Sequence, residues 1–299
     1  LVAVTGDLEP SNSVVQIILN APPANGTYRL FTYTGTKLSS FNPIVDMATG
    51  LGRKSAVLDE SVGGQVNLTV AGGFGDLVWL PQTSAVWNAT EANWSNTATA
   101  LLDVYTNFDA VTFNEAGAYS NVVTLAAALT PSAVLVDGAS NYTSAGAAIA
   151  GAAGLTKTGA GTLTILNTNT YTGPTTISDG VLHLGDGGNF NGLSGTAYIN
   201  VTNTGTLSLY SPGNLVLAQA VRGNGTWLNR GPGVSGVGEV DPTNNNAGFA
   251  GSLVLTNLRF RFSTAADVGG ATITVQDRGQ IWLMSGLNTR PITMTGLGW

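Results

Sequence analysis

The sequence predicts an all-β protein: a parallel β-solenoid over residues 81–299, preceded by a less regular β-rich segment over residues 1–80. Three observations predict this class. Apolar and polar residues alternate in short runs rich in Thr, Val, Ile and Leu, which is typical of strands. Gly, Asn or Asp interrupts these runs at bends, and a short glycine-led pattern recurs along the chain. No long stretch shows the 3.6-residue periodicity and caps of a helix.

The recurring unit is a glycine followed by two apolar residues in alternation. Copies read GTLTI, GVLHL, GTLSL, GSLVL and GQIWL, with a weaker GNGTWL, and the glycines that start them are Gly161, Gly180, Gly205, Gly251, Gly279 and Gly225. Successive copies lie 19 to 28 residues apart, which is the length of one solenoid turn. Three copies extend to TTISDGVLHL, INVTNTGTLSL and ITVQDRGQIWL, each a strand, a polar corner, a glycine and a strand. Each copy is expected to be one coil, with equivalent corners stacked.

The alternation also assigns side chains to the inside or the outside of such a coil. The expected inward residues are Leu163, Ile165, Leu182, Leu184, Leu207, Leu209, Leu253, Leu255, Ile281 and Leu283, with Ile177, Ile199, Val201, Ile273 and Val275 on a second inward face. The expected outward residues are Thr164, His183, Ser208, Val254 and Trp282. An up-and-down barrel or a sandwich is the alternative fold, but unequal units that share one corner suit a solenoid better.

Composition excludes several function classes. Charged residues make up 9% of the 299 residues, and the net charge is −6 with only eleven Lys and Arg. Nucleic acids and anionic membranes need clustered cations, so neither is an expected partner. No apolar run is long enough to span a membrane. The chain has no cysteine and one histidine, so no zinc, thiolate or other metal site and no bound cofactor is expected.

The candidate catalytic residues have simpler structural interpretations. His183 alternates with two leucines, so we expect it on the outer surface, and no Gly-x-Ser-x-Gly motif accompanies it. Two of Asp109, Glu115 and Asp137 could act as the acid and base of a glycoside-cleaving site, although isolated acids on loops are usually solvated. GPGVSG at 231–236 matches a dinucleotide-binding pattern without the following helix that such a site needs. GDGGN at 185–189 is a single copy, too few for a calcium roll, and is expected to be a corner.

The tryptophans raise the question of carbohydrate binding. Six of them could cover the ends and joints of a β-helix or form a platform for sugar rings: Trp79, Trp87, Trp94, Trp227, Trp282 and Trp299. Trp282 has outward parity and is the best candidate for such a platform. An arginine or clustered acids beside an exposed aromatic would favour a carbohydrate-related function, whereas a featureless face of Thr and Asn would favour a structural one. A lyase would also need a basic residue, and only Lys37, Lys54 and Lys157 are present.

One stretch resembles a known family. LTKTGAGTLTILNTNTYTGPTTISDGVLHLG, residues 155–185, is similar to the passenger-associated transport repeat of bacterial autotransporter-type surface proteins, through Leu155-Thr-Lys157-Thr-Gly159, Gly161-Thr-Leu163, Asn169-Thr-Tyr171-Thr-Gly173 and Gly180-Val-Leu182. Pro174 stands where a second glycine is usual. The resemblance implies a right-handed parallel β-helix, exported and displayed on or released from a Gram-negative-type cell, and it implies no enzymatic activity.

The expected function is therefore that of a non-enzymatic, extracellular or cell-surface structural or adhesive protein. A polysaccharide-binding or polysaccharide-degrading β-helix is the alternative. Both ends of the chain, LVAVTG and RPITMTGLGW, have apolar strand patterns without a polar cap. We therefore expect copies to join head to tail into a filament, with Leu1, Val2 and Trp299 at the contact.

Overall fold

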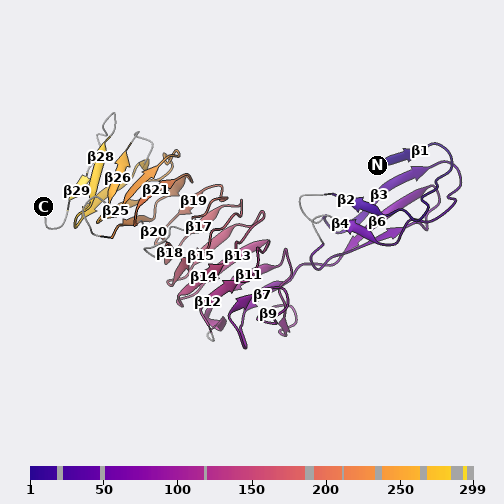
Figure 1. Ribbon diagram of the computed structural model, residues 1–299, viewed down its shortest axis with the longest axis horizontal. Helices are drawn as coiled ribbons and strands as arrows, with labels where there is room; N and C mark the ends of the chain where they lie inside the picture. Colours follow the sequence, from indigo (N-terminus) through magenta and orange to yellow (C-terminus); the bar gives the residue numbers. More distant parts are fainter. Residues whose placement is uncertain are drawn as a thin grey trace. The chain divides into compact units, whose positions relative to one another are not determined.

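The computed structural model describes residues 1–18, 23–47, 51–117, 120–185, 192–210, 212–232, 238–262, 268–283 and 292–294. The chain divides into two compact units, residues 1–75 and 76–299, and no sheet of the described residues contains strands of both (Figure 1). The predicted boundary after residue 80 falls just beyond β7 (Asp76–Trp79), the first strand of the second unit. Strands dominate the described residues, which also include the short 3₁₀ turn η1 (Glu115–Gly117). The prediction of an all-β protein is confirmed.

The first unit combines parallel and antiparallel pairing. Its four-stranded sheet has the order β1-β3-β6-β5, in which β1 and β3 are parallel and β6 is antiparallel to β3 and β5: β1 (Val2–Val4), β3 (Gly26–Tyr33), β6 (Gln65–Ala71) and β5 (Ser55–Asp59). A separate parallel pair joins β2 (Val15–Ile17) to β4 (Val45–Met47). This mixed pairing agrees with the less regular β-rich segment expected there.

The second unit is a parallel β-helix whose coils contribute one strand to each of two long sheets. The first sheet has nine strands in the order β10 (Leu102–Asp103), β9 (Trp94–Asn96), β7, β11 (Ala110–Phe113), β13 (Ala133–Asp137), β15 (Leu155–Thr158), β17 (Thr175–Ile177), β19 (Ile199–Val201) and β22 (Val221–Gly223). From β7 to β22 every pair is parallel. At the other end of the sheet, β9 pairs antiparallel with both β7 and β10. We call it the first helix sheet.

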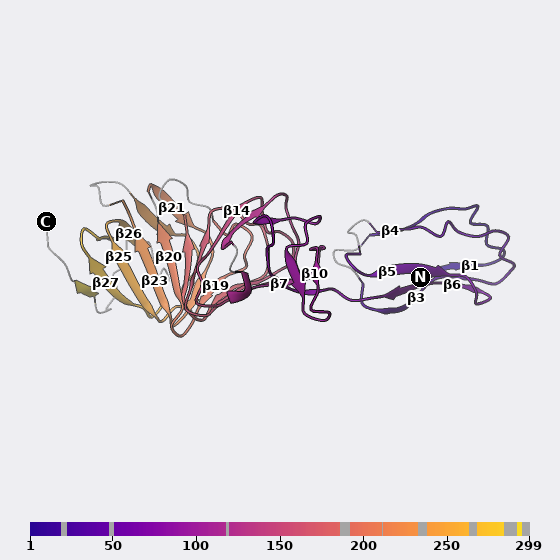
Figure 2. The same ribbon diagram turned by 90° about the horizontal axis from the view of Figure 1, so that it is seen from below.

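The second helix sheet is parallel throughout. Its ten strands are β8 (Val86–Trp87), β12 (Val122–Leu125), β14 (Tyr142–Gly146), β16 (Thr162–Ile165), β18 (Val181–Leu184), β20 (Thr206–Tyr210), β23 (Thr226–Arg230), β25 (Ser252–Thr256), β27 (Thr272–Gln276) and β29 (Ile292–Met294). Figure 2 shows β20, β23, β25 and β27 side by side in this sheet. Parallel strands stacked in this way satisfy each backbone through the coils before and after it.

A third helix sheet begins only in the later coils. It has the order β21 (Asn214–Leu217), β24 (Glu239–Pro242), β26 (Arg259–Phe262) and β28 (Gln280–Leu283), all parallel. In earlier coils this side is formed by isolated parallel bridges, such as Leu129 to Ile149 and Asn169 to Leu193. Three sides therefore enclose one core, which runs from Leu77 to Val275.

The predicted register is confirmed for the first two helix sheets. The inward residues that are buried, with exposed fractions of 0–4%, are Leu163, Ile165, Leu182, Leu184, Leu207, Leu209, Leu253, Leu255, Ile177, Ile199, Val201, Ile273 and Val275. Thr164, His183 and Val254 are half-buried and Trp282 is exposed, as outward positions should be. Ser208 is also outward but is buried, because the larger His183 and Leu228 stand beside it on the neighbouring strands.

The prediction was wrong for the last copy of the glycine-led pattern. Gly279 precedes β28, which pairs with β26 in the third helix sheet, so this corner does not stack on the corners at Gly180 and Gly205. Ile273 and Val275, predicted to share an inward face with Ile177, are inward but pair with Leu253 and Leu255 in the second helix sheet. The predicted inward residue Leu283 is 41% exposed, and Ile281 is only partly buried. Among the described residues β28 is the last strand of its sheet, so no described coil covers these side chains on that side.

Candidate functional site

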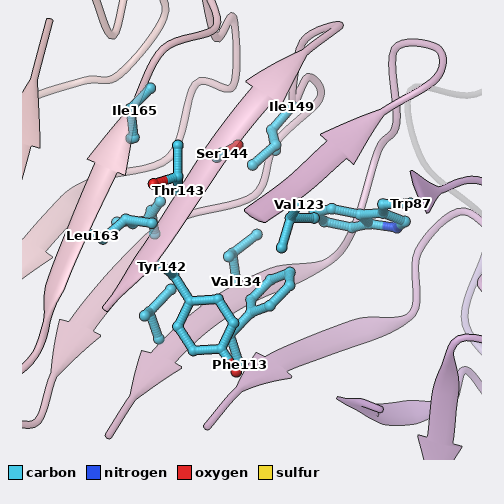
Figure 3. Close-up of a pocket in the computed structure, with 12 residues that line it drawn as sticks. Trp87, Phe113, Val123, Val134, Tyr142, Thr143, Ser144, Ile149, Leu163 and Ile165 are labelled. Carbon is cyan, nitrogen blue, oxygen red and sulfur yellow. The ribbon is translucent and has the colours of Figure 1, made fainter. Parts of the chain in front are cut away.

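The described interior contains an apolar pocket, lined by Trp87, Phe113 and Tyr142 together with aliphatic side chains such as Val123 and Val134 (Figure 3). These aromatic rings belong to a larger cluster in which Trp87, Trp94, Tyr105 and Phe113 make edge-to-face contacts. The pocket lining carries no acid, base or thiol. These side chains pack against one another as part of the hydrophobic core.

Two of the three candidate catalytic acids act as caps. Glu115 accepts hydrogen bonds from the backbone N–H of Ala139 and from the N–H and hydroxyl of Ser140, across to the next coil. These bonds, chiefly that from the Ser140 hydroxyl, lower the pKa of Glu115. Asp109 is buried and accepts the backbone N–H of Thr106 at 2.9 Å. Each carboxylate is thus engaged by backbone groups, and that of Glu115 by the Ser140 hydroxyl as well.

His183 lies on the outer face of β18, as predicted. Its Nδ1 is 3.0 Å from the hydroxyl of Ser208, its neighbour on β20. Burial and the charge of Arg230 lower the pKa of His183. The Ser–His pair stands in a ladder on the outer surface of a regular sheet, and the described structure adds no third member of a catalytic triad to it.

The strongest polar feature of the interior is Lys157, which is fully buried. It takes an inward position in β15, stacked between Val136 and Ile177 of the adjacent coils. Its ammonium donates hydrogen bonds to the carbonyl oxygens of Thr158 and Gly159, at 2.5 and 2.6 Å. The side chain therefore folds back onto the corner between β15 and β16 and binds two of its backbone carbonyls.

Carboxylates from the coils on either side balance this buried charge. Burial lowers the pKa of Lys157, while the charges of Asp179 and Asp137 act in the opposite direction. Asp137 accepts a hydrogen bond from the hydroxyl of Thr158 at 2.8 Å, and Asp179 accepts one from Thr204 at 2.7 Å. The bond from Thr204 lowers the pKa of Asp179. Asp137, the third candidate acid, thus belongs to a polar ladder that links successive corners.

Buried asparagines close the third side of the same coil. The Oδ1 of Asn169 accepts the backbone N–H of Ile149 at 2.8 Å and the Nδ2 of Asn167 at 2.9 Å. Asn167 also donates to the carbonyl of Ala147 and accepts from the hydroxyl of Ser144. These amides pair backbone groups where no continuous sheet exists to do so, which buried polar groups require.

A chain of hydroxyls completes the coil. Tyr171 is buried and its hydroxyl is 2.7 Å from that of Thr175, which lies 3.0 Å from that of Thr196 in the next coil. Thr196 donates onward to the carbonyl of Gly173 at 2.7 Å. Residues 155–184 are therefore a structural site, in which internal polar side chains lock three adjacent coils in register.

The later coils carry a different kind of site, on the outward face of the third helix sheet. Trp282 is 43% exposed, and the guanidinium groups of Arg259 and Arg261 lie 4.8 and 5.7 Å from its ring centroid. Arg261 is bonded to Asp241 at 3.2 Å, and Glu239 lies within 3.6 to 3.9 Å of both arginines. Arginines and acids therefore lie beside an exposed aromatic ring, the feature that would favour a carbohydrate-related function. The sequence did not predict this arrangement, because its members come from three different coils.

The other candidates are placed as follows. Leu1 and Val2 are 83% and 52% exposed, and Val2 begins the edge strand β1. Trp299, most of the glycine-rich 185–189 stretch and residues 233–236 of GPGVSG lie outside the described residues. In the described part of the chain, no group of three or more acids and histidines is arranged to hold a metal ion. Nor does that part contain a helix with the length and hydropathy that a membrane span requires.

Comparison with known proteins identifies one segment of the chain. Residues 155–184 match the family described as passenger-associated-transport-repeat. This is the segment that supplies Lys157, Asn169 and Tyr171 to the buried polar contacts, and it lies within the continuous parallel β-helix. No curated protein matches the chain, and no solved structure does.

Proposed function

We propose that the chain is an extracellular, passenger-type β-helix of a surface protein, non-enzymatic, in which the β-helix itself is the structural or adhesive element. The observation that carries this is the transport repeat at 155–184 built into the core of a parallel β-helix. The three candidate acids support a non-enzymatic role, because each binds backbone or hydroxyl groups of its own or an adjacent coil.

Cell-surface labelling tests the location. Antibodies raised against the purified chain should label intact, unpermeabilised cells of the source organism or be recovered from its medium. External protease should remove the signal from the cells, while a cytoplasmic marker stays intact. Recovery of the protein only in the cytoplasmic fraction would overturn the proposal.

An assembly contact forms the finer part of the proposal. Val2 lies on β1, at the edge of the first unit's sheet, and an exposed apolar edge strand is a template for a second chain. If a different surface of a second copy binds this edge strand, the same contact can repeat from copy to copy. Such a head-to-tail contact joins the copies into a filament. We expect Val2→Lys to lower the sedimentation coefficient of the assembled protein. Val14→Lys, at a position that is also 52% exposed but outside the sheet, is the matched control. A wild-type protein that sediments as a monomer at all concentrations contradicts this part alone.

A further inference from the structure

On the outward face of the third helix sheet, the strand register aligns charged side chains and an exposed tryptophan in columns. Asp241 on β24, Arg261 on β26 and Trp282 on β28 stand on successive strands, with Val216 on β21 before them. A parallel column runs beside it, from Asn214 through Glu239 and Arg259 to Gln280. Strands lie about 4.8 Å apart, so the four members of a column extend over roughly 14 Å. We call these two columns the Trp282 platform.

The tryptophan of this platform is exceptional among those described. Trp79, Trp87, Trp94 and Trp227 are at most 1% exposed, whereas Trp282 is 43% exposed. An indole left in water on a flat sheet forgoes the free energy that burial of its ring would give. The two guanidinium groups hold this ring by cation–π contacts, so its position is fixed before any ligand arrives.

The charged members are fixed as well. Glu239 and Asp241 have side chains only 14% and 21% exposed, and they bind arginines that are 39% and 33% exposed. In a chain with 9% charged residues, two acids and two arginines here form a network of zero net charge. Several charges held in one network orient their remaining hydrogen-bonding groups better than an isolated surface pair does.

We infer that the Trp282 platform binds a neutral polysaccharide. A pyranose ring presents an apolar C–H face and a rim of hydroxyls, and it therefore matches an exposed indole bordered by guanidinium donors and carboxylate acceptors. The zero net charge gives no electrostatic attraction to an anionic polymer, which favours a neutral glycan. Both carboxylates are engaged by arginines, so the site binds sugar without cleaving it.

This site is independent of the proposed location and assembly. Its test uses purified full-length protein, and its failure would leave surface display and the β-helical scaffold untouched. The test equally separates a neutral ligand from an acidic one, because a uronate polymer would have to attract the arginines away from Glu239 and Asp241.

The experiment is affinity electrophoresis through gels that contain soluble glucans, xylans, mannans or galactans, with polygalacturonate as the anionic comparison. Wild-type protein should be retarded by at least one neutral polymer, with a change in tryptophan fluorescence. Trp282→Ala should weaken retardation at least tenfold, Trp282→Phe should keep part of it, and Arg259→Ala should weaken it severalfold. Val122→Ser, at an outward position of the second helix sheet that is 52% exposed, should bind as wild type. Circular dichroism of each variant confirms the fold.

Three results would overturn the inference. The first is no retardation by any neutral polymer. The second is undiminished binding by Trp282→Ala, which would place the contact elsewhere. The third is retardation by polygalacturonate alone that added salt abolishes, which would show an anion site.

Discussion

A buried lysine sets the chemistry of the repeat at the scale of single residues. Lys157 occupies a position where the adjacent coils place Val136 and Ile177, and a charge at such a position is costly unless it is bonded. Two backbone carbonyls and two flanking carboxylates supply that compensation. The side chain is therefore best understood as a clamp on the corner rather than as a catalytic base.

Replacing this lysine tests the interpretation. Lys157→Ala removes the bonds and leaves a cavity, so we expect the free energy of unfolding to fall by about 3 kcal/mol. Lys157→Met keeps most of the volume and removes the desolvated charge, so the loss should be only about 1 kcal/mol. Equilibrium denaturation in urea measures both. A Lys157→Met variant as stable as wild type would show that packing alone, and not the bonds to the corner carbonyls, explains the position.

The single histidine gives a pH dependence with a definite sign. Burial and Arg230 lower the pKa of His183, so between its folded value and about 6.5 the unfolded chain binds a proton that the folded protein does not. The stability contributed by neutral His183 is thus present above pH 6.5 and is lost as the pH falls through the folded pKa. His183→Gln should flatten the decline in melting temperature between pH 6.5 and 5, whereas the steeper loss near pH 4 from carboxylates such as Glu115 should remain. An unchanged slope would contradict this assignment.

Side-chain parity was predictable from the sequence, and the buried contacts were not. Alternation alone placed Leu182 and Leu184 inside and His183 outside. The same parity puts Lys157 inside with Leu155, but nothing in the local pattern shows which carbonyls its ammonium reaches. Ser208 is buried by neighbours from other coils, which a reading of one strand does not include.

At the scale of elements, the corners between the first and second helix sheets depend on glycine. Gly159 and Gly180 have φ values of +67° and +64°, a region that other residues rarely adopt. A Cβ at Gly159 would lie 2.4 Å from the backbone nitrogen of Gly138, and one at Gly180 would lie 2.3 Å from the carbonyl of Gly159. Stacked corners are thus too close for any side chain at these positions.

Alanine substitution tests these corners. Gly159→Ala should lower the free energy of unfolding by about 2 kcal/mol or more, because backbone strain and a clash with an adjacent corner add. The matched control is Gly213→Ala in the same unit, where a Cβ would meet no atom within 4 Å. We expect that variant to stay within about 0.5 kcal/mol of wild type, as surface changes usually do. Comparable losses for both glycines, measured by guanidinium denaturation, would rule out corner stacking as the cause.

The glycine-led pattern predicted strands and corners but not which corner. The copy at Gly279 looks like those at Gly180 and Gly205, yet it turns from the second helix sheet to the third. A strand–glycine–strand pattern is the same at either corner, because both need a bend between two inward-facing runs. The number of sheets in the β-helix could not be predicted from the sequence either, because the third helix sheet begins only at Asn214.

At the scale of the whole molecule, the strands from β7 to β29 and those of the first unit belong to different sheets. The described core of the β-helix extends from Leu77 to Val275, while Val66, Leu68 and Val70 are buried in the first unit. Solenoid coils contact mainly their neighbours, so stability within the β-helix should pass from coil to coil. The sequence predicted a less regular β-rich segment ahead of the β-helix, because residues 1–80 show no regular coil rhythm.

Hydrogen exchange on Gly159→Ala tests whether damage spreads in this way. Amide protection reports local opening, and a strained corner should raise opening first in the coils bonded to it. We expect protection to fall most in β15 to β18, less in β12 and β20, and not at all in β3 and β6, whose hydrogen bonds lie within another sheet. Gly213→Ala, analysed in parallel, should match wild type throughout. A uniform loss in every strand, β3 and β6 included, would mean that the chain opens as one cooperative unit, because only global unfolding exposes amides that share no sheet with the altered corner.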